Sequence, residues 1–279
     1  MTSFALCILS NSHVGALKDA WATRPQRVCD GFSLTFFAAP MNLMQHVQLD
    51  GGALVPADRE LEKRFALTSG GRTQIEIADF DGFAVVGLGF GVDLVALFRN
   101  LSVSGQSAGD GGIAPLVSRQ CVVAAARDMM EQSLALEIVD ALRMVTDAPI
   151  AVHAAPYRPD WLVDQPPLST LPRSELAAIA GEIAAMAAAI TPELERTHGC
   201  RIFWQDDSTV SAPGLTASKF VHMHAATPSR PAQRDMKHMN AAYGRLAMGA
   251  LLDNFDRLSE GRVLTGEARK ARARRLKAS

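Results

Sequence analysis

Five short apolar segments, spread along the chain and separated by longer stretches, constrain the fold more than any other feature. The first of them is apolar throughout, which is typical of a strand buried on both faces of a sheet. Stretches with helical periodicity lie between several of the segments, and a helix is the usual connection between parallel strands. The segments are residues 4–9, 32–38, 83–88, 150–153 and 201–205.

This alternation predicts an α/β fold, namely a three-layer α/β/α sandwich around a flavodoxin-like parallel sheet of five strands in the order 2-1-3-4-5. Ligands of such sheets bind beyond the carboxyl ends of the strands, near the point where the strand order reverses. In this chain that point follows the first strand, where the polar residues 10–13 begin. We therefore expect the functional site at this turn.

Between the strands, the sequence predicts helices and loops of unequal length. Ser118 is expected to cap one long helix through about residue 146, Ser174 opens an alanine-rich helix to about residue 190, and the last helix spans residues 239–258. Residues 41–73 read as mostly loop, and residues 102–112 as a loop rich in glycine and serine.

The chain is long enough for one domain with a substantial core, since 48% of its 279 residues are hydrophobic. We expect that domain to span residues 1–260, followed by a basic tail at residues 261–279. Such a tail could contact RNA, DNA or an anionic surface, but a solvated tail is the simpler interpretation, and no aromatic residues are present among its basic side chains to stack on bases. The formal net charge of −1 gives no indication of a nucleic-acid partner, so none is expected.

Cysteine usage and hydropathy indicate a compartment. The four cysteines are widely scattered, and no pair has the spacing of a metal or redox motif. Reduced thiols are typical of a cytoplasmic protein. The first apolar segment is too short for a secretory signal, and no stretch is long enough to span a bilayer. We therefore expect a cytoplasmic protein without a transmembrane segment.

Two short motifs at opposite ends of the chain carry the chemistry. Ser12 follows the first predicted strand, and Asp235 and His238 form an Asp-x-x-His motif before the last predicted helix. In a nucleophilic serine system, Ser attacks, His takes its proton and Asp orients the His. A separation of three residues, on a turn leading into a helix, brings a carboxylate to an imidazole nitrogen. The competing interpretation is that Ser12 and Asp235 are helix caps and His238 is a surface residue.

At these residues the chain resembles the SGNH (GDSL-type) hydrolase family of three-layer α/β esterases. Many members carry Gly-Asn-Ser-His in the first block, where residues 10–13 read Ser-Asn-Ser-His; the last block, Asp-x-x-His, matches residues 235–238. The resemblance implies Ser12 as nucleophile, His238 as general base and Asp235 as the residue that holds the imidazole. It also implies a small-molecule or carbohydrate O-acyl ester as substrate, hydrolysis through an acyl-enzyme, and no metal or organic cofactor.

The stretch after the third strand departs from that family. The family carries Gly-x-Asn-Asp, whose Asn side chain donates to the oxyanion, whereas residues 87–91 read Gly-Leu-Gly-Phe-Gly. We expect backbone N–H groups to form the oxyanion hole, from Ser12 and one of Gly87, Gly89 or Gly91, because glycine tolerates positive φ. Losing one donor usually lowers the rate by about a hundredfold or more, so slow turnover is expected. A plain tight turn is the alternative role of these glycines.

Three further residues are candidates for contact with the substrate. Asn11 and His13 flank Ser12, and Arg158 follows the fourth strand at the same end of the sheet. A guanidinium suits an anionic or sugar-like substrate. For His13, packing within the first helical turn is an equal alternative, and for Arg158 a solvated loop position is the simpler one.

Other functions stay open on the sequence alone. An O-acyltransferase shares the covalent intermediate and differs only in the second nucleophile, and the missing Asn favours a non-catalytic carbohydrate or ligand-binding protein with the same fold. A nucleotide or flavin binder is disfavoured, because the Rossmann spacing and a Walker lysine are absent. His222 and His224 would share one face of an extended segment, which permits a metal site, although ordinary loop histidines are the simpler interpretation.

Overall fold

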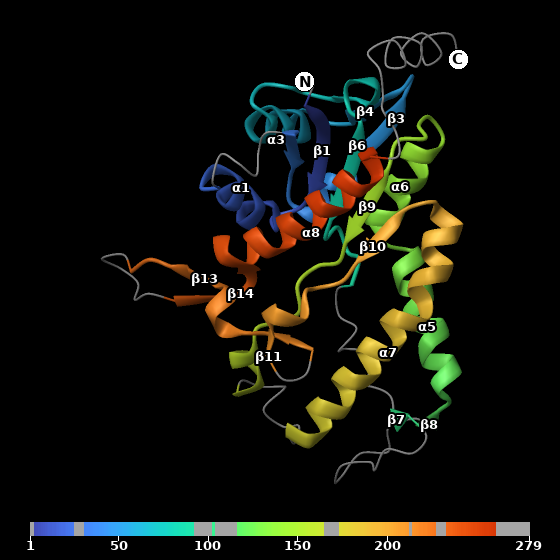
Figure 1. Ribbon diagram of the computed structural model, residues 1–279, viewed down its shortest axis with the longest axis vertical. Coiled ribbons are helices and arrows are strands. Elements are labelled where there is room, and N and C mark those ends of the chain that lie inside the picture. Colours follow the sequence, from blue (N-terminus) through green and yellow to red (C-terminus); the bar gives the residue numbers. More distant parts are fainter. Residues whose placement is uncertain are drawn as a thin grey trace.

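The computed structural model describes residues 3–24, 31–91, 102–103, 116–164, 173–211, 214–226 and 233–260. At its centre is a parallel sheet in the order β10-β9-β6-β1-β2 (Figure 1). This is the predicted order 2-1-3-4-5 of a flavodoxin-like sandwich, which is thereby confirmed. Most of the predicted loop at 102–112, and the whole tail at 261–279, lie outside the described residues. The strands are β1 (Phe4–Ser10), β2 (Phe32–Ala38), β6 (Gly82–Val86), β9 (Ile150–His153) and β10 (Arg201–Phe203).

Side chains of β1 alternate between two apolar layers, as the pleat of a strand requires. Cys7 and Leu9 belong to one layer, and Leu6 and Ile8 to the other. The sheet therefore has a helical layer on each face, which makes the three-layer sandwich. The layer of Leu6 and Ile8 is covered by α1 (Val14–Ala22) and α8 (Ala241–Glu260), and the opposite layer by α3 (Arg59–Ser69), α5 (Arg119–Glu131), α6 (Leu134–Arg143) and α7 (Arg173–His198).

Helices α1 and α8 cross at unusually short range. A Cβ atom on Gly244 would lie 1.9 Å from the carbonyl oxygen of Ala16, far inside any real contact. Only a residue without a side chain lets the two backbones approach this closely. The crossing fixes the start of α1, and with it the turn that carries Ser12, against the segment that precedes α8.

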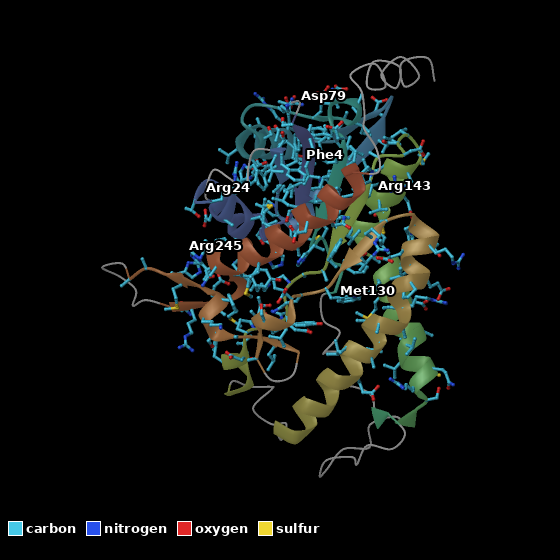
Figure 2. The ribbon with its side chains drawn as sticks, in the orientation of Figure 1. Phe4, Arg24, Asp79, Met130, Arg143 and Arg245 are labelled. Carbon is cyan, nitrogen blue, oxygen red and sulfur yellow. The ribbon has the colours of Figure 1, made fainter. Side chains whose placement is uncertain are left out.

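Aromatic rings close the opposite end of the same layer. The Phe4 ring, labelled in Figure 2, lies 5.6 Å from that of Phe32 and 5.8 Å from that of Phe255. Such edge and tilted contacts add to the free energy gained by burying the rings. They anchor the start of β1 to β2 and α8.

The single long helix predicted from Ser118 to residue 146 is wrong, because two helices occupy this span. The hydroxyl of Ser118 accepts from the N–H of Cys121 and starts α5, and that of Ser133 accepts from the N–H of Leu136 and starts α6. The apolar periodicity continues across the break and conceals it. The alanine-rich helix α7 continues past its predicted end at residue 190 and contains Pro192.

The segment 41–73, which we expected to be mostly loop, contains regular structure. It holds α2 (Met41–Met44), β3 (Val47–Asp50), β4 (Ala53–Pro56) and α3, and β5 (Ile75–Glu76) completes a sheet in the order β3-β4-β5. Gly51 and Gly52, both at positive φ, make the hairpin turn between β3 and β4. The strands are too short, and too exposed on β3, for their apolar pattern to be recognised.

Apart from β14, the other elements have two to five residues each. Within the described ranges, no helix combines the length and hydropathy needed to cross a membrane. The strands are β7 (Ser102–Val103), β8 (Leu116–Val117), β11 (Val210–Ser211), β12 (Leu215–Thr216), β13 (Val221–His224) and β14 (Gln233–Met239), and the 3-10 turns are η2 (Ile77–Asp79), η3 (Asp160–Asp164), η5 (Asp207–Thr209) and η6 (Ser218–Phe220).

Candidate active site

Ser12 lies on the turn between β1 and α1, beyond the carboxyl end of the strand. The hydroxyl of Ser10 donates to the carbonyl of Val86 at 3.0 Å and ties the end of β1 to that of β6. Asn11 is buried, and its side-chain oxygen accepts from the N–H of His13 at 3.1 Å, so this amide shapes the turn. Ser12 itself is exposed at the tip.

The hydroxyl of Ser12 does not cap a helix. The N-cap position of α1 belongs to His13, whose side chain makes no capping bond. Within the described part of the chain, the Ser12 hydroxyl has no hydrogen-bond partner. The structure therefore gives no support to the interpretation of Ser12 as a cap, and its oxygen is available to a ligand.

Asp235 and His238 lie on β14, in a two-stranded antiparallel ribbon with β13. We expected them on a turn leading directly into the last helix, and that placement is wrong. Asn240 is the residue that starts the helix, because its side-chain oxygen accepts from the N–H groups of Ala242 and Tyr243. The alternative that Asp235 caps the helix is excluded by the same bonds.

The ribbon is irregular at the motif. Pairing advances two positions along β13, from Val221 to Met223, but five positions along β14, from Met239 to Arg234. Residues 235–238 therefore include three more positions than the partner strand can pair. This excess bends the backbone enough for a carboxylate and an imidazole three residues apart to meet, which a regular strand does not allow.

The carboxylate of Asp235 accepts four hydrogen bonds. Its Oδ1 atom takes the N–H groups of Lys237 at 2.7 Å and His238 at 2.9 Å, and its Oδ2 atom takes Nδ1 of His238 and Nε2 of His224, each at 2.8 Å. Burial raises the pKa of this carboxyl, but the bonds from His238 and Lys237 outweigh burial and hold the pKa far below its usual range. Asp235 is therefore ionised, and the bond at Nδ1 leaves Nε2 of His238 for other partners.

His13 presents a second imidazole beside His238. The two ring centroids lie 5.9 Å apart. Burial lowers the pKa of His13 to about 4, with smaller contributions from the nearby His238 and His153. Its Nδ1 atom is buried and lacks a hydrogen-bond partner among the described residues. His13 is consequently neutral near pH 7 and adds no charge beside His238.

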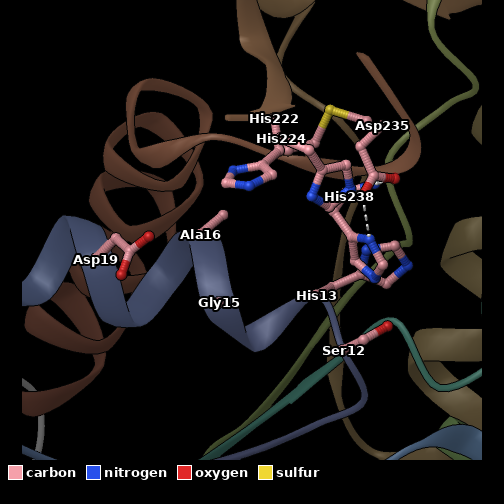
Figure 3. A pocket seen from close by; sticks show the side chains of 10 residues that line it. Ser12, His13, Gly15, Ala16, Asp19, His222, His224, Asp235 and His238 are labelled. Atoms are coloured by element: carbon pink, nitrogen blue, oxygen red, sulfur yellow. Dashed lines mark hydrogen bonds and ion pairs between the residues drawn. The ribbon is translucent and has the colours of Figure 1, made fainter. Parts of the chain in front are cut away.

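A hollow of about 220 Å³ brings the two distant motifs together. In Figure 3 the rings of His13 and His238 lie between the Asp235 carboxylate and Ser12. Within the described residues no hydrogen bond joins the Ser12 hydroxyl to His238, although both side chains line the same hollow. The lining residues are Ser12, His13, Gly15, Ala16, Asp19, His222, His224, Asp235, His238 and Met239.

The glycines after β6 form a tight turn, with Gly87, Gly89 and Gly91 all at positive φ. The N–H of Gly87 donates to the carbonyl of His153 at 2.9 Å, and that of Gly91 approaches the sulfur of Met130 at 3.2 Å. A Cβ on Gly89 would face Ser133 and Met41, on the α6 side of the sheet. None of the three glycines lines the hollow.

Gly87 nevertheless lies close to two residues of the turn that carries Ser12. A Cβ atom at this position would lie 3.0 Å from Cδ2 of His13 and 3.2 Å from Oδ1 of Asn11. The missing side chain leaves room for the His13 ring and for the turn that carries Ser12. This steric role is separate from donation to an oxyanion.

The structure does not bring Arg158 into the hollow. Its carbonyl oxygen accepts from the N–H of Thr216, and its side chain is partly exposed. The preceding Tyr157 donates its N–H to the side-chain oxygen of Gln205 at 2.7 Å. The loop after β9 is thus held by a polar network of its own, away from the lining of the hollow.

The sequence analysis did not assign His222 and His224 to this site. Both line the hollow, and their rings are 5.1 Å apart because alternate residues of a strand share a face. The His-x-His alternation was the available signal, and we interpreted it as ordinary loop histidines, with a metal site as the alternative. Among the described residues, no three His, Cys, Asp or Glu side chains are grouped so that they would hold a metal ion.

Comparisons with known proteins add little to this geometry. No family model matches the chain, and no curated protein matches it. Similar solved structures include a Streptococcus pneumonia protein provisionally described as a platelet activating factor, and the periplasmic domain of a Salmonella ser. Paratyphi A lipopolysaccharide acetyltransferase. Each is 11% identical with a TM-score of 0.39 over 91% of this chain, and covers 85% and 84%, respectively, of the other chain. Likeness at this level assigns no function to the chain.

Proposed function

We propose that this protein is an SGNH-like serine hydrolase that cleaves an O-acyl ester with Ser12, His238 and Asp235. The observation that carries the proposal is the hollow that Ser12 shares with an Asp235–His238 pair bonded through Nδ1 at 2.8 Å. That bond orients the imidazole with Nε2 as its free nitrogen. A serine hydroxyl without another partner, in the same hollow, is the group such a nitrogen would deprotonate.

The reaction follows from these roles. The Ser12 oxygen attacks the acyl carbon while its proton passes to Nε2 of His238. The tetrahedral intermediate collapses to an acyl-enzyme, and the departing alcohol takes the proton back from His238. Water then repeats the sequence and releases the acid. Asp235 stays ionised and stabilises the imidazolium that forms in each half-reaction.

Contact between Ser12 and His238 must form when the substrate binds. Catalytic hydrogen bonds are often long in ligand-free proteins and tighten in the complex, so a shared hollow is compatible with this step. We assign the backbone N–H of Ser12, which belongs to the nucleophile itself, as one oxyanion donor. The N–H groups of Gly87 and Gly91 already have partners, which supports slow turnover.

One alternative is a ligand-binding protein that has this fold but does not catalyse ester hydrolysis. The observation behind it is that no hydrogen bond joins Ser12 to His238 within the described part of the chain. An O-acyltransferase would use the same residues with an alcohol in place of water.

For the organisation of the chain, we propose one domain over residues 1–260, since both apolar layers pack on a single sheet. We also propose a cytoplasmic location, because Cys7, Cys121 and Cys200 are free thiols.

Labelling with a fluorophosphonate tests the proposal directly. The probe should modify the wild-type protein at Ser12, and Ser12→Ala should abolish the label. Ser33→Ala, which changes an exposed serine on β2, is the matched control and should label like wild type. His238→Gln should slow labelling by about a hundredfold or more, because the hydroxyl loses its base. Equal labelling of wild type and Ser12→Ala would reject Ser12 as nucleophile, and an unlabelled wild type would favour the binding protein.

A further inference from the structure

The carboxylate of Asp235 holds two imidazoles on one oxygen. Nδ1 of His238 and Nε2 of His224 both lie 2.8 Å from its Oδ2 atom. The two histidines come from different strands of the ribbon, His238 from β14 and His224 from β13. A serine, histidine and aspartate system needs only one of these bonds, so the second requires its own explanation.

Two donors on one oxygen compete for its negative charge. Each bond withdraws charge from Oδ2 and weakens the acceptor that the other imidazole uses. Oδ2 of Asp235 then stabilises a positive charge on the His238 ring less well, and protonation of that ring at Nε2 becomes less favourable. When His224 is itself protonated, its positive charge opposes the same proton.

Geometry also gives His224 an orienting role. The N–H groups of Lys237 and His238 fix Oδ1 of Asp235, while His224 approaches Oδ2 from the opposite strand. The carboxylate is therefore held from both strands and is only 10% exposed, whereas 58% of the His224 side chain is exposed. The exposed imidazole of His224 lines the hollow together with Asp235 and His238.

We propose that His224 is a positioning residue that fixes the Asp235 carboxylate and lowers the basicity of His238. This inference rests on the proposed function for its catalytic meaning, but its physical content concerns only the three side chains. Within the described residues no hydrogen bond joins His224 to Ser12 or directly to His238. His224 acts through Asp235 alone.

Other charged or titratable groups surround the pair and must be held constant in a test. His222 on β13 lies against the His224 ring, His13 at the start of α1 faces His238, and Asp19 of α1 lines the hollow. Lys237 is the adjacent cation on β14, and His153 on β9 lies behind His13. A substitution at His224 alters none of these residues themselves, and a variant of His222 controls for its ring contact with His224.

The test is a pH titration of the His238 ring by NMR in the full chain. His224→Phe removes the second donor and should raise the titration midpoint of His238 by about 0.5 unit or more. His224→Gln keeps an N–H donor without a titrating charge and should shift the midpoint by less than half as much. His222→Phe removes a neighbouring imidazole that does not touch Asp235, and it should likewise cause a smaller shift than His224→Phe.

The outcome does not depend on turnover. If the wild type never hydrolyses an ester but His224→Phe raises the His238 midpoint, the proposed function fails and the coupling through Asp235 holds. If the enzyme is active, the rising limb of kcat/KM should move to higher pH in His224→Phe, since more base is needed to free Nε2. An unchanged or lowered His238 midpoint in His224→Phe, or an equal rise in His222→Phe, would overturn the inference.

Discussion

The rings of His13 and His238 lie 5.9 Å apart at 53° to each other, and only one of them is bonded to a carboxylate. His13 is buried at Nδ1 and burial lowers its pKa to about 4, while Nδ1 of His238 is bonded to the ionised Asp235. The two neighbouring imidazoles therefore differ in their surroundings. His13 stays neutral near pH 7 and places no positive charge beside His238.

The difference between His13 and His238 predicts a simple pH dependence of ester hydrolysis. The rate on an activated ester such as p-nitrophenyl acetate should rise with pH through roughly 5 to 8, where imidazoles ordinarily titrate, because Nε2 of His238 must be free of a proton. Asp235 is ionised and His13 is neutral across this pH range, so neither residue adds a second rise or fall to the pH–rate profile. A flat profile after correction for stability would argue against His238 as the base.

Asp235→Asn should lower kcat about 10³- to 10⁴-fold, since an amide cannot stabilise the imidazolium and favours the wrong tautomer. Asp50→Asn changes an exposed aspartate on β3 and controls for the loss of one carboxylate. The measurement is kcat on the same ester at pH 8. Activity of Asp235→Asn within a few-fold of wild type would remove Asp235 from the mechanism.

His13 should make the folded protein sensitive to mild acid. Its folded pKa of about 4 lies below the ordinary value of 6.5, so between these pH values the unfolded chain binds the proton more readily. Stability is therefore present above about pH 6.5 and is lost as the pH falls toward 4, by up to about 3 kcal/mol. His13→Gln should flatten this slope in denaturant titrations, leaving the part due to His153, whose pKa burial also lowers. The exposed His46→Gln should keep the full slope.

Gly87→Ala and Gly89→Ala form a matched pair. Both residues have positive φ, +72° and +84°, so each alanine should cost about 1 kcal/mol of stability. A Cβ at Gly87 also reaches within 3.0 Å of His13, whereas the nearest atom to one at Gly89 is 3.8 Å away. We expect Gly87→Ala to lower kcat by about tenfold or more, by displacing the turn. The hypothesis that Gly89 donates to the oxyanion predicts the reverse order, so the two kcat values decide between them.

Gly244→Ala should destabilise the fold strongly. The added Cβ would lie 1.9 Å from the carbonyl oxygen of Ala16, so α1 and α8 must separate and expose part of their apolar contact. We expect a loss of about 2 kcal/mol or more in the free energy of unfolding. Gly249→Ala, on the same helix with no atom within 4 Å, should instead add up to about 1 kcal/mol through helix propensity. Similar midpoints for both variants in chemical denaturation would contradict the close crossing.

The central sheet was predictable because its strands are concentrated apolar runs, with helical sequence between several of them. The break between α5 and α6 was not, because Ser133 interrupts a periodicity that continues on both sides. The hairpin of β3 and β4 escaped notice because alternate positions of β3 are exposed, which weakens its signal. Local sequence patterns therefore predicted the strands of the core, but they did not predict the helix break or the hairpin of two short strands.

The candidate site likewise has features that the sequence predicts and features that depend on contacts between distant segments. The strand-to-turn position of Ser12 and the separation of Asp235 from His238 are visible in the sequence. The contact between His224 and Asp235 depends on a register between β13 and β14 that no local spacing encodes. The directions of the Gly87 and Gly91 N–H groups likewise depend on partners from β9 and α5, far away in the chain.

The ribbon of β13 and β14 is not part of the central sheet, yet it carries both the acid and the base of the proposed mechanism. A two-stranded ribbon is marginally stable by itself and relies on neighbours such as α1 and η6. The nucleophile follows a strand of the buried central sheet, whereas its partners lie on a separate ribbon of two strands. Warming should therefore detach the base from the serine before the sheet melts, so that inactivation precedes global unfolding and is reversed on cooling.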